Sequence, residues 1–572
     1  MTTQQLVPGN PEMAFATDGQ HVASHPMAVL QPPTPYQIRL VAGGALLCGI
    51  AGDLLLRETA EGVGLAAYLL AILATMLGIV KARVRPKHAG DIPAVQSRLL
   101  IAVGAVFATL LMLRSEEIIA FANVVTVLGA VGLSVALLPG SGLNLFALRV
   151  RDLAYAGIES WFNAAIGAML FAFRHATKLF RSGNASTLDS RLAGAIGRAV
   201  LLGGVLTLSF GLLLSAGDPV FRHVMTPLVD WNAPELMRHL ATIGFLSWPV
   251  LGLLAAVHRR LPAAGPQSIG SRIERFIAPS TPSASPTLSL NRLDALVALG
   301  AMNSLFALFM LLQFRVLFGG QAYVTATTGL TLAEYARGGF FTLTFTAALV
   351  IGLLLAIDAL LRTGSLAGWR VSRVMSSSLL GLVGVMLASA AGRMFMYVGT
   401  FGISVDRIVA LAIMAWLASV AVWFTVTVLR GRPARFVVGS LSFGAATLLL
   451  VNATNIDAIV VNSGLARVAD GRPFDVQYMT RTLSADAVPT LVRAVIDGRI
   501  DASAVVAEQA LTRGSYASGA ACTTAALLLQ RWGTATETRA SAWTFGAWRA
   551  RRAVAANAAA LRARACPIGE VA

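Results

Sequence analysis

Charged residues are scarce in this chain of 572 residues: they make up 13% of it, while 56% is hydrophobic. Because the apolar residues fall in long blocks, this composition excludes an ordinary soluble domain and predicts an integral membrane protein. Lysine occurs only at Lys81, Lys87 and Lys178, so arginine carries nearly all of the formal net charge of +17. Most of these cations lie in short loops between apolar blocks, which indicates membrane topology and argues against a nucleic-acid partner.

Cysteine and histidine are also rare. The three cysteines are Cys48, Cys522 and Cys566, and no CxxC, Cys/His cluster or HExxH spacing occurs in the sequence. A structural zinc site is therefore not expected. Walker A, GxSxG and paired metal-ligand motifs are absent as well, which leaves ATPase, hydrolase and metalloenzyme activities without support. The sequence thus predicts no catalytic residue, no metal and no cofactor.

Eleven apolar blocks, each close to the ~20 residues that cross ~30 Å of hydrocarbon, predict an all-α polytopic transmembrane bundle. Lys and Arg concentrate in every second loop across all eleven blocks. By the positive-inside rule, this bias places the N-terminus in the cytoplasm and the C-terminus outside it, as in a multi-pass protein of a cell inner membrane. The predicted spans are 39–56, 63–80, 99–113, 118–138, 194–215, 239–257, 293–314, 338–361, 376–398, 408–429 and 436–453.

The spans divide into an N-terminal bundle over 39–257 and a C-terminal bundle over 293–454. Residues 258–292 are rich in Pro, Ser and Ala and predict a cytoplasmic linker between the two. Residues 1–38 contain neither Lys nor Arg and show no periodicity, which predicts a disordered cytoplasmic tail.

The segment 143–179 carries apolar residues at helical spacing, with Arg149, Arg151 and Asp152 between them. This pattern predicts an amphipathic helix that lies in the inner membrane interface. A pair of further spans is the alternative.

Residues 455–572 have ordinary polarity and predict a small helical domain outside the cytoplasm. Ser484 is expected to cap one of its helices, and further helices are expected over 501–512, 519–532 and 540–565. Antiparallel packing of the last two would bring Cys522 and Cys566 together, and an oxidising compartment would favour a disulfide between them. Two unrelated small residues are the alternative.

Ionisable residues at the ends of spans are the candidate site, because charge at membrane depth is costly. Eight of them map to the outer ends of the predicted spans: Asp218, Arg222, Arg315, Glu334, Arg337, Arg393, Asp406 and Arg407. They predict a paired network around a polar outer cavity, with Arg393 bonded to a carboxylate of Asp218, Glu334 or Asp406. The alternative is that span ends carry charges which pair locally or extend toward water.

Six short motifs recur in an order that is typical of one family. They are Ser215-Ala-Gly-Asp-Pro-Val-Phe221, Gln313 with Leu317-Phe-Gly-Gly320, Tyr335-Ala-Arg-Gly-Gly-Phe340, Tyr397 with Phe401-Gly-Ile403 and Asp406-Arg407, Asn455-Ile-Asp457, and Leu483-Ser-Ala-Asp-Ala-Val-Pro489. Over roughly Val41–Arg499 the chain resembles a bacterial family of multi-pass membrane proteins that is catalogued only as a domain of unknown function. The resemblance implies fold and location, and it implies no activity.

Three classes of function fit this pattern. The exported domain and the lack of catalytic motifs favour a non-enzymatic membrane scaffold or sensor, whose partners are the lipid bilayer and another membrane or periplasmic protein. A transporter or flippase that uses the outer polar residues is the first alternative. A membrane enzyme that acts on lipid-linked substrates, with Asp218 or Glu334 as base, is the second.

Overall fold

A computed structural model gives the fold. It describes residues 35–57, 61–83, 92–137, 144–179, 233–258, 295–311, 332–360, 366–472, 474–500, 519–533 and 540–566. All secondary structure within these ranges is helical. Seven helices among them are long and apolar enough to cross a membrane: Ile38–Leu56, Gly62–Lys81, Glu117–Ala136, Arg238–Ala256, Arg370–Phe401, Val405–Thr427 and Pro433–Ala453.

Three shorter apolar helices accompany these seven: Val95–Leu110, Ala295–Leu311 and Leu343–Asp358. Each of the ten coincides with one predicted span. The remaining predicted span, 194–215, lies outside the described residues, and so do most of the predicted tail, most of the linker and the helix expected over 501–512. The last four residues of the predicted tail, 35–38, instead form the start of a helix. The chain is thus a helical protein with several helices that could span a membrane, and the number eleven stays a prediction.

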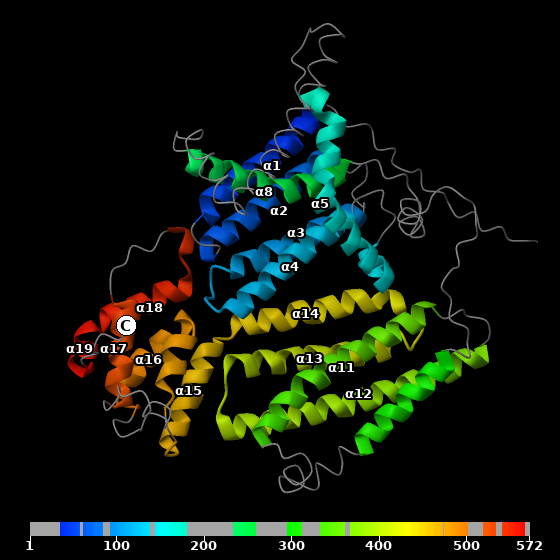
Figure 1. Ribbon diagram of the computed structural model, residues 1–572. Coiled ribbons are helices and arrows are strands. Elements are labelled where there is room, and N and C mark those ends of the chain that lie inside the picture. The colour runs from blue at the N-terminus through cyan, green and yellow to red at the C-terminus, as the bar shows by residue number, and fades with distance from the viewer. Residues whose placement is uncertain are drawn as a thin grey trace, which may run out of the picture.

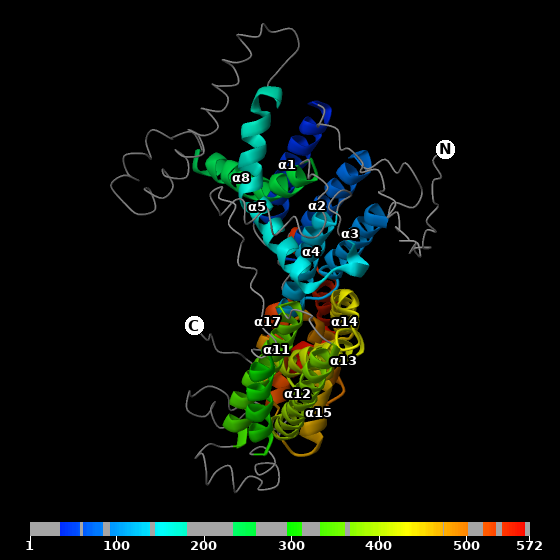
Figure 2. The ribbon, with the colours of Figure 1, turned by 90° about the vertical axis from the view of Figure 1, so that its right-hand side faces the viewer.

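The helices form two layers of roughly parallel and antiparallel rods (Figures 1 and 2). The first bundle contains α1 (Pro35–Leu56), α2 (Gly62–Arg83), α3 (Ile92–Leu110), α4 (Glu117–Ala136) and α8 (Ala233–His258). Its core is built from fully buried side chains such as Leu73, Phe107 and Leu254.

The second bundle contains Ala295–Leu311, α11 (Leu332–Leu360), α12 (Leu366–Phe401), α13 (Val405–Thr427) and α14 (Phe436–Ala453). Leu354, Val383 and Phe424 are central to its core. The two bundles meet where α14 packs against α4.

Helix α5 (Val150–Leu179) follows a short turn of helix at Leu145–Ala147 and is one unbroken helix of 30 residues. It runs across the first bundle and not along it (Figure 1). Ser160 donates a hydrogen bond to the Gly132 carbonyl of α4 at 2.9 Å, and Trp248 of α8 donates one to the Ala165 carbonyl at 2.7 Å. The helix expected over 143–179 is therefore present as α5 over Val150–Leu179, after the separate turn at Leu145–Ala147, and its place at a membrane interface stays a prediction.

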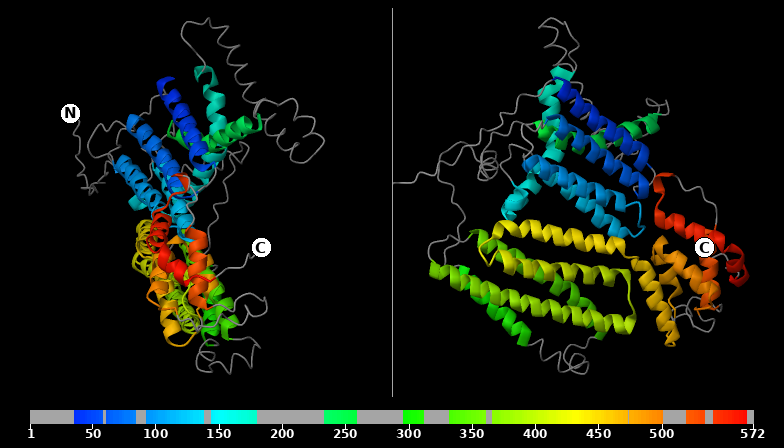
Figure 3. Two further views of the ribbon diagram at one scale, coloured as in Figure 1. Left: turned by 90° about the vertical axis from the view of Figure 1, so that its left-hand side faces the viewer. Right: turned by 180° about the vertical axis from the view of Figure 1, so that it is seen from behind.

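The last helices gather beside one end of the bundles (Figure 3), and we call them the C-terminal unit. They are α15 (Ile456–Ala469), a π turn at Tyr478–Thr482, a 3-10 turn at Ala485–Ala487, α16 (Val488–Ile496), α17 (Ala520–Trp532), a 3-10 turn at Ala540–Ala542, α18 (Phe545–Ala556) and α19 (Ala558–Arg564). They share a core that includes Val460, Leu491, Ala525, Val554 and Leu561.

Ser484 caps the turn that precedes α16, because its side chain accepts a hydrogen bond from the Asp486 backbone N–H. The predicted cap is confirmed. The prediction of a single helix over 540–565 is wrong. Thr544 caps α18 by accepting from the Ala547 N–H, and the chain breaks again at Asn557.

The C-terminal unit contacts several turns at the same end of the bundles. Val63, at the start of α2, donates its N–H to the Trp543 carbonyl at 3.0 Å. Arg467 of α15 donates to the Thr400 carbonyl at the end of α12 at 2.9 Å. The first and second bundles are thus both tied to these helices.

Candidate functional site

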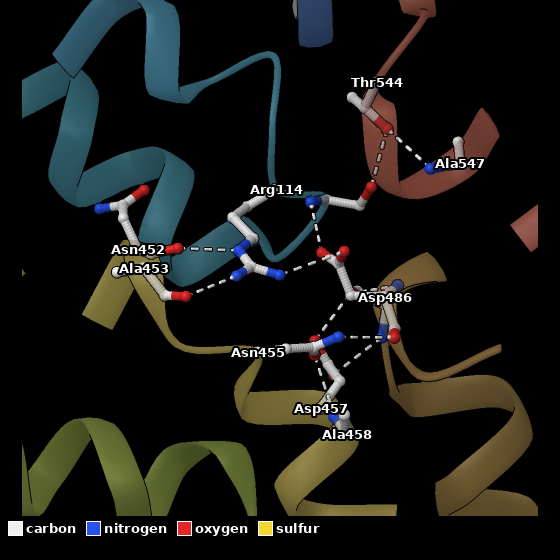
Figure 4. A network of polar contacts seen from close by, with 11 residues as sticks. Arg114, Asn452, Ala453, Asn455, Asp457, Ala458, Asp486, Thr544 and Ala547 are labelled. Carbon is white, nitrogen blue, oxygen red and sulfur yellow. Dashed lines mark hydrogen bonds and ion pairs between the residues drawn. The ribbon is translucent and has the colours of Figure 1, made fainter. Parts of the chain in front are cut away.

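A network of polar contacts lies where the two bundles and the C-terminal unit meet (Figure 4). We call it the junction site and define it by Arg114, Ser115, Asn455, Asp457, Ser484 and Asp486. Its members come from the turn between α3 and α4, from the start of α15 and from the turn before α16.

Arg114 is the central cation. Its Nε donates to the Asn452 carbonyl at 2.9 Å and its Nη2 to the Ala453 carbonyl at 3.1 Å. These carbonyls end α14, where four acceptors have no partner within the helix and the macrodipole is negative. Nη1 lies 3.5 Å from Asp486 Oδ1, so one guanidinium joins the first bundle, the second bundle and the C-terminal unit.

Asp486 is the matching anion, and its side chain is 3% exposed. Its Oδ2 accepts from the Ser115 backbone N–H at 3.1 Å. Ser115 in turn shares a hydrogen bond of 2.8 Å with the Thr544 hydroxyl, which caps α18. A buried carboxylate needs such partners to offset the loss of hydration.

The second half of the site connects α15 to the turn before α16. Ser484 donates from Oγ to Asp457 Oδ2 at 2.9 Å and from its backbone N–H to Oδ1 at 3.3 Å. Asn455 caps α15 through the Ala458 N–H and donates to the Asp486 carbonyl at 3.2 Å. The Ser484 hydroxyl also accepts from the Asp486 N–H. It therefore acts both as a hydrogen-bond donor and as an acceptor in this turn.

A pair of amides lies beneath the junction site, between the bundles. Asn123 of α4 and Asn452 of α14 exchange hydrogen bonds at 2.9 and 3.0 Å, and both residues are buried. In such a pair each amide supplies hydrogen-bond partners for the other in an apolar environment. The pair therefore fixes the position of α4 along α14.

The charges around the junction site disfavour the ionised form of Glu116, which follows Ser115 in the chain. Burial, together with the nearby carboxylates of Asp457, Glu117, Asp406 and Asp486, raises the pKa of Glu116 to about 7. Burial also raises the pKa of Asp457, although its bonds from Ser484 oppose that shift. Arg114 is the cation that lies among these groups.

A second contact region lies at the turn between α12 and α13. Arg407 donates to the Gly402 carbonyl, and its guanidinium carbon lies 4.4 Å from the centroid of the Tyr397 ring. Gly402 has φ of +84°, a conformation that favours glycine. Arg467 and Arg472 bind the Gly399 and Thr400 carbonyls at 2.9–3.2 Å and so cap α12 from the C-terminal unit.

The structure describes the side chains of only some of the eight predicted site residues. Asp218, Arg222 and Arg315 lie outside the described residues, and Glu334 and Arg337 lie in the first turns of α11, where side chains are not described. Arg393 is 7% exposed within α12. Asp406 lies in the first turn of α13, beside Arg407. The expected pairing of Arg393 stays a prediction.

Asp53, which ends the first predicted span, has two partners, Arg57 directly after α1 and His239 of α8. It is 5% exposed, and its Oδ2 lies 2.8 Å from His239 Nδ1 of α8 and 3.2 Å from Arg57 Nη2. His239 Nε2 lies 3.2 Å from Glu235 Oε1. This cluster ties the adjoining ends of α1 and α8 together.

Cys522 of α17 and Cys566, which follows α19, form a disulfide with their Cα atoms 5.1 Å apart. The Cys566 N–H also donates to the Cys522 carbonyl at 3.4 Å. Cys48 is buried in α1 as a free thiol.

The sequence motifs contain Asp457 and the turn around Ser484, but no motif contains Arg114, Glu116 or Thr544. Arg114 had one available signal, because it lies in a loop on the side that is poor in cations. Its partner is 372 residues away in the chain, and no local pattern encodes such a contact.

These features define a class: a helical protein with several helices that could span a membrane and a set of C-terminal helices bonded to one end of them. The chain belongs to the family described as Domain of unknown function (DUF4153), whose model matches residues 101–494. The matched region contains every member of the junction site and ends within α16, before the disulfide. No curated protein and no solved structure matches the chain.

Proposed function

We propose that the chain is an eleven-span protein of a bacterial inner membrane, with its N-terminus in the cytoplasm and its C-terminus outside. In this proposal it acts as a non-enzymatic scaffold or sensor, and it holds the C-terminal unit rigidly at the outer surface for another membrane or periplasmic protein. The alternation of arginine-rich loops supports the orientation.

The junction site is the observation that carries this proposal. Arg114 binds both the end of α14 and Asp486, and Asp457 binds Ser484. The polar groups are bonded to one another, which favours a structural link over a path for a substrate. A unit fixed in this way can transmit a force or a binding event to the spans, because a bonded network moves as one body.

The orientation is tested with reporter fusions in growing cells. Fusions after Gln96, Gly270 and Thr363 should be active as cytoplasmic reporters, and a fusion after Asp501 should be active as an exported reporter. A cytoplasmic signal at Asp501 would overturn the orientation.

The scaffold function is tested by photo-crosslinking in cells, with the reactive residue placed at Arg493 or Asp497 on the exposed side of α16. We expect a discrete adduct with one protein from these positions. Val422, which is 65% exposed on α13 and faces the lipid in this proposal, is the control and should give none. Equal adducts from all three positions, or none from α16, would contradict a specific partner.

A further inference from the structure

Helix α18 has two faces of different character. Gly546, Ala550 and Val554 are buried against the rest of the C-terminal unit, at the spacing of one helix face. Phe545, Trp548, Arg549 and Arg552 are exposed on the other side. Trp548 and Arg549 follow Phe545 by three and four residues, and Arg552 follows them by four and three. We call these four residues and the preceding Trp543 the aromatic–arginine face.

The aromatic rings of this face are partly exposed. Trp543, Phe545 and Trp548 are 36%, 38% and 40% exposed, and the rings of Phe545 and Trp548 stack with centroids 5.5 Å apart. A cluster of half-exposed aromatics is costly in water, and it is typical of surfaces that meet a partner or a membrane interface.

Two cations lie over these rings. The guanidinium carbon of Arg549 is 5.8 Å from the Phe545 centroid, and that of Arg552 is 5.3 Å from the Trp548 centroid. Each cation is held at the level of the aromatic rings. A planar guanidinium binds phosphate oxygens through two parallel N–H donors, so the face combines apolar rings with phosphate binders.

The position of the face selects its partner. The Trp543 carbonyl accepts from the N–H of Val63 in the first turn of α2, and the Phe545 N–H donates to the Met112 carbonyl just after α3 at 2.8 Å. Leu113, the next residue, is 46% exposed. The face therefore begins at the level where two apolar helices end, which is where Trp side chains concentrate in membrane proteins and where long Arg side chains can reach the headgroups. Figure 3 shows α18 beside these helix ends.

We propose that the aromatic–arginine face is a binding surface for anionic phospholipid, in which the rings enter the headgroup layer and Arg549 and Arg552 bind the phosphates. In this proposal the phospholipid headgroups of the surrounding bilayer lie at the same level as the aromatic–arginine face. This surface would also fix the tilt of the C-terminal unit. The proposal requires that the bundles span a membrane, but it does not depend on which side the unit occupies or on any protein partner.

The test uses the purified full chain in detergent, titrated with phosphatidylglycerol or phosphatidylcholine and read by native mass spectrometry. The wild type should prefer phosphatidylglycerol. Arg549→Gln/Arg552→Gln should bind it about 25-fold more weakly, since each surface cation contributes about a factor of five. The control pair Arg562→Gln/Arg564→Gln, exposed on α19, should keep the preference. Equal loss in both pairs, or no loss, would overturn the proposal.

A second measurement locates the face directly. In nanodiscs, lipids with brominated chains should quench the fluorescence of Trp548. This component is the difference between the emission of the wild type and that of Trp548→Phe. Quenching of that same component by aqueous acrylamide and not by the brominated lipids would place the face in water and overturn the proposal. Protection of Trp548 that requires an added protein would likewise assign the face to a protein partner.

Discussion

Arg114 and Asp486 are separated by 372 residues in the chain, and their side chains lie 3.5 Å apart at the junction of three helical groups. Their side chains are 16% and 3% exposed, so this ion pair is largely withdrawn from water. A pair of this kind contributes little net free energy against an apolar replacement, but removal of one partner leaves a buried charge without compensation.

We therefore expect Arg114→Ala to lower the free energy of unfolding by about 2–4 kcal/mol, because Asp486 loses its cationic partner and two carbonyls of α14 lose their donor. Thermal unfolding in detergent measures the change. Arg238→Ala is the control: Arg238 pairs with Glu235 at 2.6 Å, but both side chains are more than half exposed, and the cost should stay below about 1 kcal/mol.

The double variant Arg114→Ala/Asp486→Ala separates the ion pair from other effects. It should be less destabilised than the sum of the two single variants, because neither charge is then left alone. Additive losses would show that the two side chains act independently.

A close approach between α8 and α5 gives a second prediction. A Cβ at Gly252 would lie against the Asn163 carbonyl and 3.2 Å from the Ala168 nitrogen. These are backbone atoms of α5, which cannot relieve the clash by a change of rotamer. Gly252→Ala should therefore cost about 1–3 kcal/mol of stability. Gly244, on the same helix, has open space where its Cβ would be, and Gly244→Ala should be neutral or slightly stabilising. Equal melting temperatures for the two variants would contradict this packing.

The sequence predicts the helices well because hydropathy acts locally. The last predicted span, 436–453, coincides with α14. The preceding span was expected over 408–429, whereas α13 is Val405–Thr427. This helix starts earlier because its first N–H, that of Val405, donates to the Tyr478 hydroxyl of the C-terminal unit, a contact that no local pattern contains.

The same limit explains the two failures in the C-terminal unit. Ala-rich sequence over 540–565 favours a continuous helix, but Thr544 caps α18 and Phe545 donates to Met112, more than 400 residues earlier. In the junction site, the sequence identified the motif residues Asn455, Asp457 and Ser484. It could not pair that cluster with Arg114, because tertiary packing alone brings the turn between α3 and α4 to it.

The raised pKa of Glu116 predicts a pH dependence of stability. The folded pKa of about 7 lies above the ordinary value of 4.5, so the folded state favours the protonated carboxyl. Its stabilising contribution is complete below pH 4.5 and is lost as the pH rises toward 7. Melting temperatures measured from pH 5 to 7.5 should therefore fall less steeply in Glu116→Gln than in the wild type. Glu61, which is exposed and is not among the charges that raise the pKa of Glu116, is the control, and Glu61→Gln should keep the wild-type slope.

The disulfide between Cys522 and Cys566 gives the last prediction. It closes a loop with a sequence separation of 44 and fastens the end of α19 to α17. By the chain-entropy estimate, such a loop contributes about 4 kcal/mol to stability. Cells are lysed with free thiols blocked, and the denatured chain is then treated with reductant and a heavy maleimide. Two labels should be added, whereas without reductant there should be none.

Cys48 provides the internal control for this experiment. It is a buried free thiol, so blocking after denaturation consumes it, and Cys48→Ser should leave the labelling pattern unchanged. Cys566→Ser should abolish the reductant-dependent labels and lower the melting temperature of the C-terminal unit. Both cysteines found free in unreduced membranes would contradict the bond. That result would also weigh against an exported C-terminal unit, because a reducing cytoplasm keeps a pair of this kind as thiols.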